Sequence, residues 1–258
     1  MSKERPLILV SNDDGISAPG IRHLIRLMQK LGDVFVVAPN SPQSGMSHAI
    51  TLESILFSKK VHVEGDEVTE YSCSGTPVDC VKLAMNKLST RKPDLCVSGI
   101  NHGANSSVNV LYSGTMAAAI EGAIAGVPSI GFSLLDYSQD ADFFQSEDHV
   151  LQIARHVLEN GLPSGICLNV NIPKLSFEHI KGVKVCRQSD GNWEEDFDER
   201  INPMGKTYYW LKGKFYNHDE GKDTDIWALE NGYISVVPVK FDLTAHDHIQ
   251  QLNFLNYE

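Results

Sequence analysis

Two adjacent carboxylates and a glycine follow an apolar run near the start of the chain. The run covers residues 7–10, and Asp13, Asp14 and Gly15 come shortly after it. A strand of this kind in an open α/β sheet delivers the residues that follow it to the carboxyl edge, where such sheets bind ligands. Carboxylate oxygens are hard ligands, so the pair favours Mg²⁺ or Mn²⁺. An Asp-Asp pair is also common in plain turns and helix caps, so it needs support from other motifs.

Two further polar segments follow predicted strands. Residues 38–48 come after one such strand and contain Ser44, and residues 99–105 come after another and contain Asn101. Segments that follow parallel strands leave the sheet at the same edge, so we expect them to meet the two carboxylates in one crevice. Together the carboxylates, the Ser44 hydroxyl and the Asn101 amide would form an all-oxygen metal site with room for water and a phosphate oxygen.

The segment Tyr112-Ser113-Gly114-Thr115 precedes an Ala-rich stretch that predicts a helix. Its backbone N–H groups, its two hydroxyls and the helix dipole could hold the remaining phosphate oxygens without a nearby Lys or Arg. A Ser-Gly-Thr sequence is also a common simple helix cap. With the metal site, the segment predicts transfer of a phosphoryl group to water, with a metal-activated water as the nucleophile.

The elements that must position these residues alternate between strand and helix. Pro19 and Gly20 open a helix in which Ile21, Leu24 and Ile25 keep helical spacing. Short strands that alternate with helices imply an α/β fold with a mostly parallel sheet. The predicted strands are 7–10, 34–37, 95–98, 129–133 and 166–170, and the later predicted helices are 76–87, 115–125 and 149–159.

The pattern changes near residue 173. Strand-like runs at 183–186, 208–211 and 233–239 replace the alternation, and the acidic run 194–199 is expected to be a solvated face or loop. We therefore expect a catalytic core over 1–173 and a β-rich region over 174–258. Such strands need a partner edge, which a neighbouring subunit can provide, so the second region is expected to build an oligomer.

Composition excludes several classes of partner. The chain has 258 residues and a formal net charge of -11, which disfavours polymeric nucleic acid. It has no apolar run of the roughly 20 residues that a membrane span needs, and its first residues lack the apolar stretch of a signal peptide, so we expect a cytoplasmic protein without membrane contact. The five cysteines include no CxxC pair and are expected to be buried, reduced thiols.

Taken together, the motifs resemble the survival protein E family of 5'/3'-nucleotidases. The matching segments are Ser-Asn-Asp-Asp-Gly (11–15), Ala-Pro-Gly (18–20), Val-Ala-Pro (37–39), Gln-Ser-Gly (43–45), Ser-Gly-Thr-Pro-x-Asp-Cys (74–80), Ser-Gly-Ile-Asn-x-Gly-x-Asn (98–105) and Tyr-Ser-Gly-Thr (112–115). The resemblance is dense from residue 7 to about 133 and continues more sparsely to 238.

The resemblance implies a metal-dependent acid phosphatase that hydrolyses nucleoside 5'- and 3'-monophosphates, with some members also acting on short polyphosphate. It implies a Rossmann-like core and a C-terminal region that exchanges elements between subunits in a homodimer or homotetramer. By similarity, one Mg²⁺ or Mn²⁺ would be held by Asp13, Asp14, Ser44 and Asn101, with Asp13, Asp14 and Asn101 as the catalytic residues. The phosphate would contact Gly45, Asn105, Ser113, Gly114 and Thr115.

Two alternatives remain beside this interpretation. A nucleotide-binding regulatory module without turnover would explain residues 113–115 but not the carboxylates, and neither the dinucleotide-binding nor the P-loop glycine motif is present. A phospho-aspartate phosphatase would place its two carboxylates two residues apart, whereas Asp13 and Asp14 are adjacent. His48 and His102 each follow a site motif and could protonate a leaving group or simply form structural hydrogen bonds.

Overall fold

A nine-stranded sheet forms the centre of the protein. The structure, a computed structural model, describes residues 5–62, 68–138 and 140–257. The strand order is β3-β4-β2-β1-β5-β6-β7-β11-β8, and all neighbouring pairs are parallel except β3–β4 and β7–β11. The strands are β1 (Leu7–Ser11), β2 (Asp33–Pro39), β3 (Ser58–Val61), β4 (Thr69–Cys73), β5 (Leu95–His102), β6 (Ser129–Leu134), β7 (Ile166–Ile172), β8 (Val183–Val185) and β11 (Ile234–Lys240). The fold is therefore α/β with a mostly parallel sheet.

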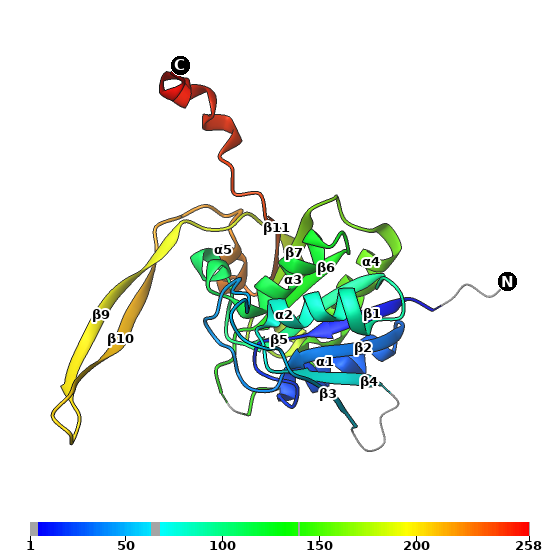
Figure 1. The fold of residues 1–258 in the computed structure, drawn as a ribbon. Helices are drawn as coiled ribbons and strands as arrows, with labels where there is room; N and C mark the ends of the chain where they lie inside the picture. The colour runs from blue at the N-terminus through cyan, green and yellow to red at the C-terminus, as the bar shows by residue number, and fades with distance from the viewer. Residues whose placement is uncertain (1–4, 63–67, 139, 258) are drawn as a thin grey trace.

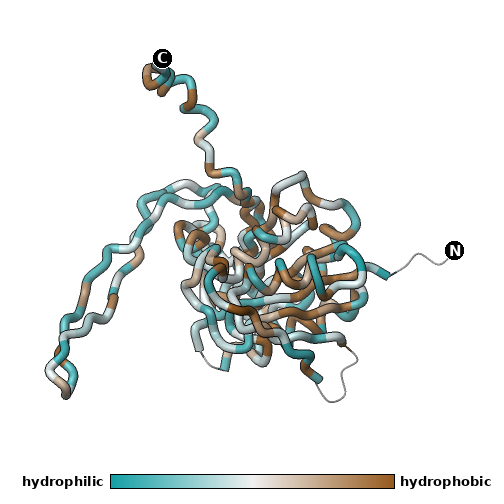
Figure 2. The backbone as a smooth tube through the Cα atoms, in the orientation of Figure 1, coloured by the Kyte–Doolittle hydropathy of each residue, from teal (hydrophilic) through white to brown (hydrophobic). Residues whose placement is uncertain are grey.

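Helices cover both faces of this sheet (Figure 1). They are α1 (Pro19–Gln29), α2 (Pro77–Leu83), α3 (Gly114–Ile124), α4 (Glu147–Asn160) and α5 (Asp225–Glu230). Helices α1 and α4 pack together on one face over a large apolar core, while α2 and α3 pack together on the other. Figure 2 shows the hydrophobic central strands between these layers.

The apolar periodicity predicted most of these elements. The five predicted strands and the four predicted helices are confirmed, with boundaries that differ by a few residues. At α2 the structure also confirms the expected start, because the Thr76 hydroxyl accepts a hydrogen bond from the Asp79 N–H and Pro77 opens the helix. Strands β3 and β4 and helix α5 were not predicted. Strand β4 has the sequence Thr-Glu-Tyr-Ser-Cys, and its buried Glu70 is paired with Arg22. Because most of its residues are polar, the apolar pattern that predicts buried strands is missing there.

The C-terminal region divides into two parts. Strands β8 and β11 pair within the main sheet, so the expectation that the strands after residue 173 need an edge from another subunit is wrong for these two. The other part is a two-stranded antiparallel hairpin of β9 (Gly191–Ile201) and β10 (Thr207–Asn217), which projects away from the body (Figure 1). The acidic run 194–199 lies in β9 as an exposed strand and not in a loop, because each of its residues pairs with β10.

Two expectations from composition can be compared with the described residues. All five cysteines are buried and free, which confirms the reading of them as reduced thiols. Within residues 5–62, 68–138 and 140–257, none of the helices is long and apolar enough to cross a membrane. The first four residues, on which the expectation about a signal peptide partly rests, lie outside the described residues.

Candidate active site

The register between β1 and β5 brings the acidic pair to the polar end of β5, which includes Asn101 and His102. Ser11, the last residue of β1, lies opposite Ser98, so the residues that follow β1 leave the sheet beside the end of β5, residues 99–102. Beyond this point Asp14 lies near His102, which is the neighbour of Asn101 and acts on the Asp14 carboxyl group through its charge and its main chain. Parallel strands thus place two sequence-distant motifs at one carboxyl edge, as the sequence predicts.

Asp13 is tied to the start of α3. Its side chain is buried, and its Oδ1 accepts a hydrogen bond of 2.5 Å from the Thr115 hydroxyl. Gly114 permits this close approach, because a Cβ at that position would lie 2.7 Å from the Cβ of Asp13. The small residue is therefore needed where the helix meets the carboxylate.

Burial makes the acidic pair electrostatically costly in the bare protein. Burial raises the pKa of Asp13 to about 6, and the charge on Asp14 adds to the rise, although the Thr115 hydrogen bond opposes it. The pKa of Asp14 is also raised, again mainly by burial. Its Oδ2 is buried without a hydrogen-bond partner among the residues that the structure describes. A cation would relieve both effects, because it supplies the missing partner and favours the charged carboxylates.

Ser44 reaches this edge on the loop of residues 40–51, here called the Ser44 loop. The N–H of Gln43 donates a 2.7 Å hydrogen bond to the main-chain oxygen of Asp13, which fixes the loop one residue before Ser44. Ser44 and Gly45 are both exposed at the surface of this turn. The structure thus brings the Ser44 segment alongside the acidic pair.

Asn101 presents its amide in a defined orientation. Its Nδ2 donates to the main-chain oxygens of His102 at 3.2 Å and Gly103 at 2.9 Å. Carbonyl oxygens only accept, so the nitrogen must lie on that side and Oδ1 remains as an acceptor or metal ligand. In the described part of the chain, no three His, Cys, Asp or Glu side chains form a metal cluster. A cation at this edge would therefore depend on oxygens from Ser44 and Asn101 in addition to the two carboxylates.

Three of the residues predicted to contact phosphate use their side chains in hydrogen bonds within the protein. Ser113 is the N-cap of α3, and its hydroxyl accepts a 3.0 Å hydrogen bond from the N–H of Met116. The Thr115 hydroxyl donates to Asp13, and so does not face outward to a phosphate. Asn105 is buried and donates from Nδ2 to the Ser133 hydroxyl at 2.8 Å. The hydrogen-bond ladder of α3 begins with the bond from the Ala117 N–H to the Ser113 oxygen, so the N–H groups of Gly114 and Thr115 come before the ladder.

A cluster of charged and polar side chains around the buried Glu121, next to the site, was not predicted. Glu121, in the middle of α3, contacts Lys82 Nζ at 2.6 Å and His48 Nε2 at 3.1 Å. Burial opposes its ionisation, but the hydrogen bonds from His48 and Lys82 lower the pKa of Glu121. Glu121 stands among alanines in a helix that packs against the sheet, and this lone acidic residue is the signal that could have revealed the cluster.

The other candidate histidine is beside the acidic pair. Burial raises the pKa of Asp14, and His102 lies close enough for its charge to oppose that rise. Its ring meets the edge of Phe143, with the ring centroids 5.1 Å apart. The two histidines left open by the sequence therefore occupy different environments, one beside Asp14 and one in the cluster around Glu121.

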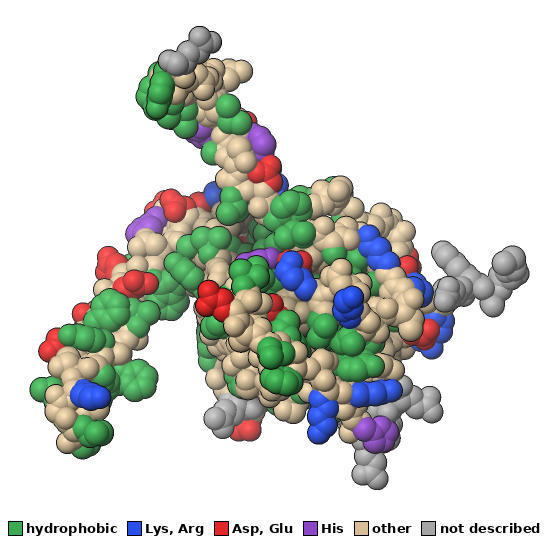
Figure 3. All heavy atoms as spheres, viewed as in Figure 1, with side chains coloured by type: hydrophobic (Ala, Val, Ile, Leu, Met, Phe, Trp, Pro, Cys, Tyr) green, Lys and Arg blue, Asp and Glu red, His purple; other side chains and the backbone are tan. Residues whose placement is uncertain are grey.

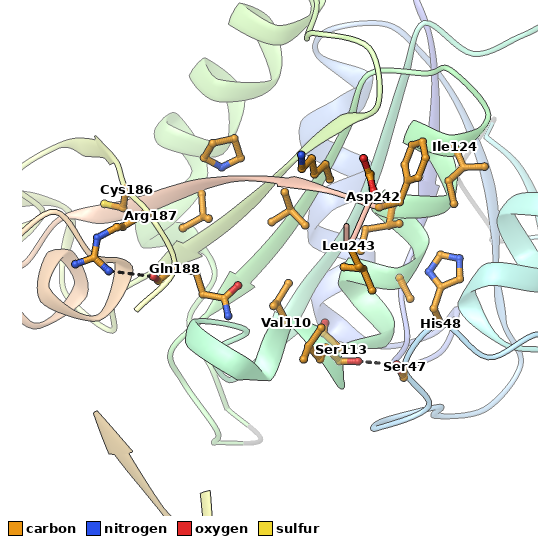
Figure 4. A pocket seen from close by; sticks show the side chains of 18 residues that line it. Ser47, His48, Val110, Ser113, Ile124, Cys186, Arg187, Gln188, Asp242 and Leu243 are labelled. Carbon is orange, nitrogen blue, oxygen red and sulfur yellow. Dashed lines mark hydrogen bonds between the residues drawn. The ribbon is translucent and has the colours of Figure 1, made fainter. Parts of the chain in front are cut away.

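A pocket of about 760 Å³ opens beside the start of α3, between that helix and the segment around β11. Figure 4 shows Ser47, His48 and Ser113 together at one side of it. Its remaining lining is mostly apolar, with Ile120 and Ile124 from α3 and Val237 from β11 among the residues. The pocket thus adjoins the candidate site through Ser113.

The fold and this edge define an α/β protein with an acidic ligand site at the carboxyl ends of its parallel strands. The family model described as "Survival protein SurE" matches residues 8–195, and the chain belongs to this family. Two relatives named 5'-nucleotidase SurE are those of Christiangramia forsetii, 63% identical with 98% of each chain covered, and Flavobacterium psychrophilum, 64% identical with 96% of this chain and 97% of the relative covered.

A solved structure shares the fold. The crystal structure of the SurE protein from Aquifex aeolicus superposes with a TM-score of 0.83 at 39% sequence identity, and the match covers 97% of this chain and 99% of that one. The similarity therefore includes the region after residue 173 as well as the α/β core. Membership of the family confirms the resemblance seen in the motifs.

Proposed function

We propose that this protein is a nucleotidase that hydrolyses nucleoside 5'- and 3'-monophosphates to nucleoside and phosphate. The observation that carries the proposal is the acidic pair of buried Asp13 and half-buried Asp14: the Oδ2 atom of Asp14 has no hydrogen-bond partner among the described residues, and Asp13 is bonded to the start of α3. Relatives named 5'-nucleotidase support the substrate class. Short polyphosphate is a second substrate to test.

The donor set fits one Mg²⁺ or Mn²⁺ ion. We assign Asp13, Asp14, Ser44 and Asn101 as its ligands, because all four offer oxygen and none offers the sulfur or imidazole nitrogen that Zn²⁺ prefers. When bound, the cation would polarise a phosphate oxygen and activate a water molecule for attack. The raised pKa of Asp13 and the unpartnered Oδ2 of Asp14 support this assignment.

The chain's own groups would orient the reaction. The hydroxyl of Thr115 holds Asp13 in one orientation, so the carboxylate does not have to be ordered when substrate binds. The N–H groups at the start of α3 and the N–H of Gly45 would donate to phosphate oxygens. For Ser113 and Asn105 we propose a contribution through the backbone and local packing, since their side chains already form structural hydrogen bonds.

A substrate panel tests the proposal. Purified protein is incubated with nucleoside 5'- and 3'-monophosphates, p-nitrophenyl phosphate and tripolyphosphate, each with Mn²⁺ or with EDTA, and released phosphate is measured. We expect Mn²⁺-dependent release from the monophosphates. Binding of nucleotide without release would favour the regulatory module instead, and a phosphorylated protein trapped by acid quench would indicate a covalent aspartyl route.

We also propose that the C-terminal region makes a homodimer or homotetramer. Exposed apolar side chains along the hairpin support this, because a two-stranded hairpin is marginally stable alone. They include Phe197, Tyr209, Trp210 and Leu211. Figure 3 shows hydrophobic side chains gathered on the projecting hairpin and at the C-terminal end of the chain. In this proposal residues 1–173 carry the chemistry and the projecting parts of 174–258 carry assembly.

A further inference from the structure

The Ser44 loop is fixed on both sides of Ser44. Before Ser44, the N–H of Gln43 donates to the main-chain oxygen of Asp13. A hydrogen bond from the Met46 N–H to the Gln43 oxygen closes the turn that contains Ser44, and a bond from Ala49 to Met46 closes the next turn. After Ser44, both Ser47 and His48 contact other elements. The exposed turn that carries Ser44 is thus held between two anchors.

The first downstream anchor is a strained residue. Ser47 has a positive φ of 53°, which is unfavourable for a residue other than glycine. Its hydroxyl donates a 2.6 Å hydrogen bond to the Leu111 oxygen, and its N–H donates to the Tyr112 oxygen at 3.3 Å. These bonds join the loop to the segment that leads into Ser113.

The second downstream anchor is a hydrogen bond between the His48 ring and a buried carboxylate. His48 Nε2 lies 3.1 Å from Glu121 Oε2, while the other carboxylate oxygen of Glu121 contacts Lys82. Glu121 is only 5% exposed, while the His48 side chain is about one-third exposed, so the contact lies at the edge of the buried region. It lies on α3, whose first turn holds Asp13 through Thr115. One rigid helix therefore carries both the partner of Asp13 and the partner of the Ser44 loop.

We propose that His48 is a positioning residue that acts through Glu121 and does not donate a proton to the leaving group. Its bond to Glu121 holds the turn around Ser44 against α3, so that the Ser44 oxygen keeps its place relative to Asp13 and Asp14. The inference rests on the proposed function, because it takes Ser44 as a metal ligand. Residues that orient metal ligands typically change metal affinity about 10- to 100-fold when they are removed.

Mn²⁺ titration calorimetry of the intact chain tests this positioning role. His48→Ala is expected to weaken Mn²⁺ binding about tenfold or more, and Glu121→Gln to weaken it in the same direction. His48→Gln is expected to restore most of the affinity, because its side-chain amide can donate to Glu121 in place of the imidazole. Glu70→Gln is the matched control, since it removes another buried carboxylate that pairs with Arg22, away from the Ser44 loop.

The possible outcomes separate the inference from the proposed function. If Ser44→Ala leaves Mn²⁺ affinity unchanged, the metal site and the inference both fail. If Ser44→Ala weakens binding but His48→Ala does not, only the positioning role fails. A proton donor would give a further signature that overturns the inference: His48→Ala and His48→Gln would both lose kcat on nucleoside monophosphates while their Mn²⁺ affinity stayed at the wild-type value.

Discussion

At the scale of single residues, Thr115 links the start of α3 to the carboxylate of Asp13. It is fully buried, and its hydroxyl donates to Asp13 while Ser113 caps the helix. The contact thus serves the carboxylate, although the sequence alone suggested a phosphate contact or a cap. This distinction has kinetic consequences.

Thr115→Val should lower kcat/KM for nucleoside monophosphates about ten- to a hundredfold, because a hydrogen bond to a charged group is worth about 1.5–3 kcal/mol. Thr115→Ser keeps the donor and should retain most of the activity. Steady-state kinetics of the two variants provide the measurement. A valine variant with wild-type kinetics and only a lower melting temperature would show that Thr115 serves the helix alone.

Asp13 predicts a pH dependence of stability in the metal-free protein. Its folded-state pKa is raised from 3.8 to about 6, so between these pH values the folded protein binds more protons than the unfolded chain, and stability falls as pH rises. The full penalty is about 3 kcal/mol and is reached above about pH 6. In EDTA, denaturant unfolding should show Asp13→Asn gaining stability relative to wild type from pH 4 to 6.

Asp79 provides a control of opposite sign for this pH experiment. Although burial opposes it, hydrogen bonds from Thr51 and Thr76 lower the pKa of Asp79. Its stabilising contribution is therefore present above the unfolded pKa and lost as pH falls, so Asp79→Asn should lose stability most at neutral pH. Parallel curves for the two variants would contradict the assigned electrostatics.

At the scale of elements, the position of α3 against the sheet sets the geometry of the candidate site around Asp13. The helix touches Asp13 at its first turn and packs on the sheet through Gly122, where a Cβ would lie 2.3 Å from the Ser129 hydroxyl. Gly114→Ala would push against Asp13, while Gly122→Ala would push the same helix away from the core. The two glycines allow a comparison on one element.

Gly114→Ala should lower kcat/KM at least tenfold and weaken Mn²⁺ binding, because the added methyl group displaces Asp13, which we propose as a metal ligand. Gly122→Ala should lower the melting temperature through overpacking and leave the activity of the folded protein close to wild type. Kinetics, calorimetry and thermal melts of both variants test this. Equal loss of activity in both would mean that helix displacement, and not the contact with Asp13, limits catalysis.

The elements show what sequence reasoning could and could not reach. Apolar runs such as Leu95 to Val97 predict buried strands because burial on both faces demands continuous hydrophobicity, and the order of those strands brings Asp13 and Asn101 to one edge. These patterns do not show which side chains will form hydrogen bonds or ion pairs with one another. Whether the Thr115 hydroxyl meets phosphate or Asp13 depends on the rotation of α3, and the Glu121 cluster depends on the packing of α2 against α3.

Assembly belongs to the scale of the whole molecule. The hairpin is held at its base, where Trp193 Nε1 donates a 2.7 Å hydrogen bond to Oδ1 of Asn109. Most of its length is exposed and projects from the body (Figure 1). Deletion of all residues from 174 onward would also remove β8 and β11 from the main sheet. A sharper test is to remove the exposed hairpin alone.

Replacing residues 195–212 by a short Gly-Ser turn should reduce the oligomer to a smaller species and leave Mn²⁺ binding intact. Sedimentation velocity of the intact and shortened chains is the measurement, with calorimetry as the check on folding. The account expects the intact chain to be at least a dimer. An intact chain that sediments as a fully active monomer at micromolar concentration would disprove the assembly proposal.

The central claim is that the Asp13–Asp14 pair carries metal-dependent hydrolysis of nucleoside monophosphates. Asp14→Asn keeps the shape of the side chain but removes one negative charge from the proposed cation site, and Asp13→Asn does the same for its neighbour. The most direct test is phosphate release from a nucleoside 5'-monophosphate at saturating Mn²⁺ by the wild type and both variants. The account predicts turnover by the wild type and losses of several orders of magnitude in the folded variants. Wild-type rates in both variants would contradict it.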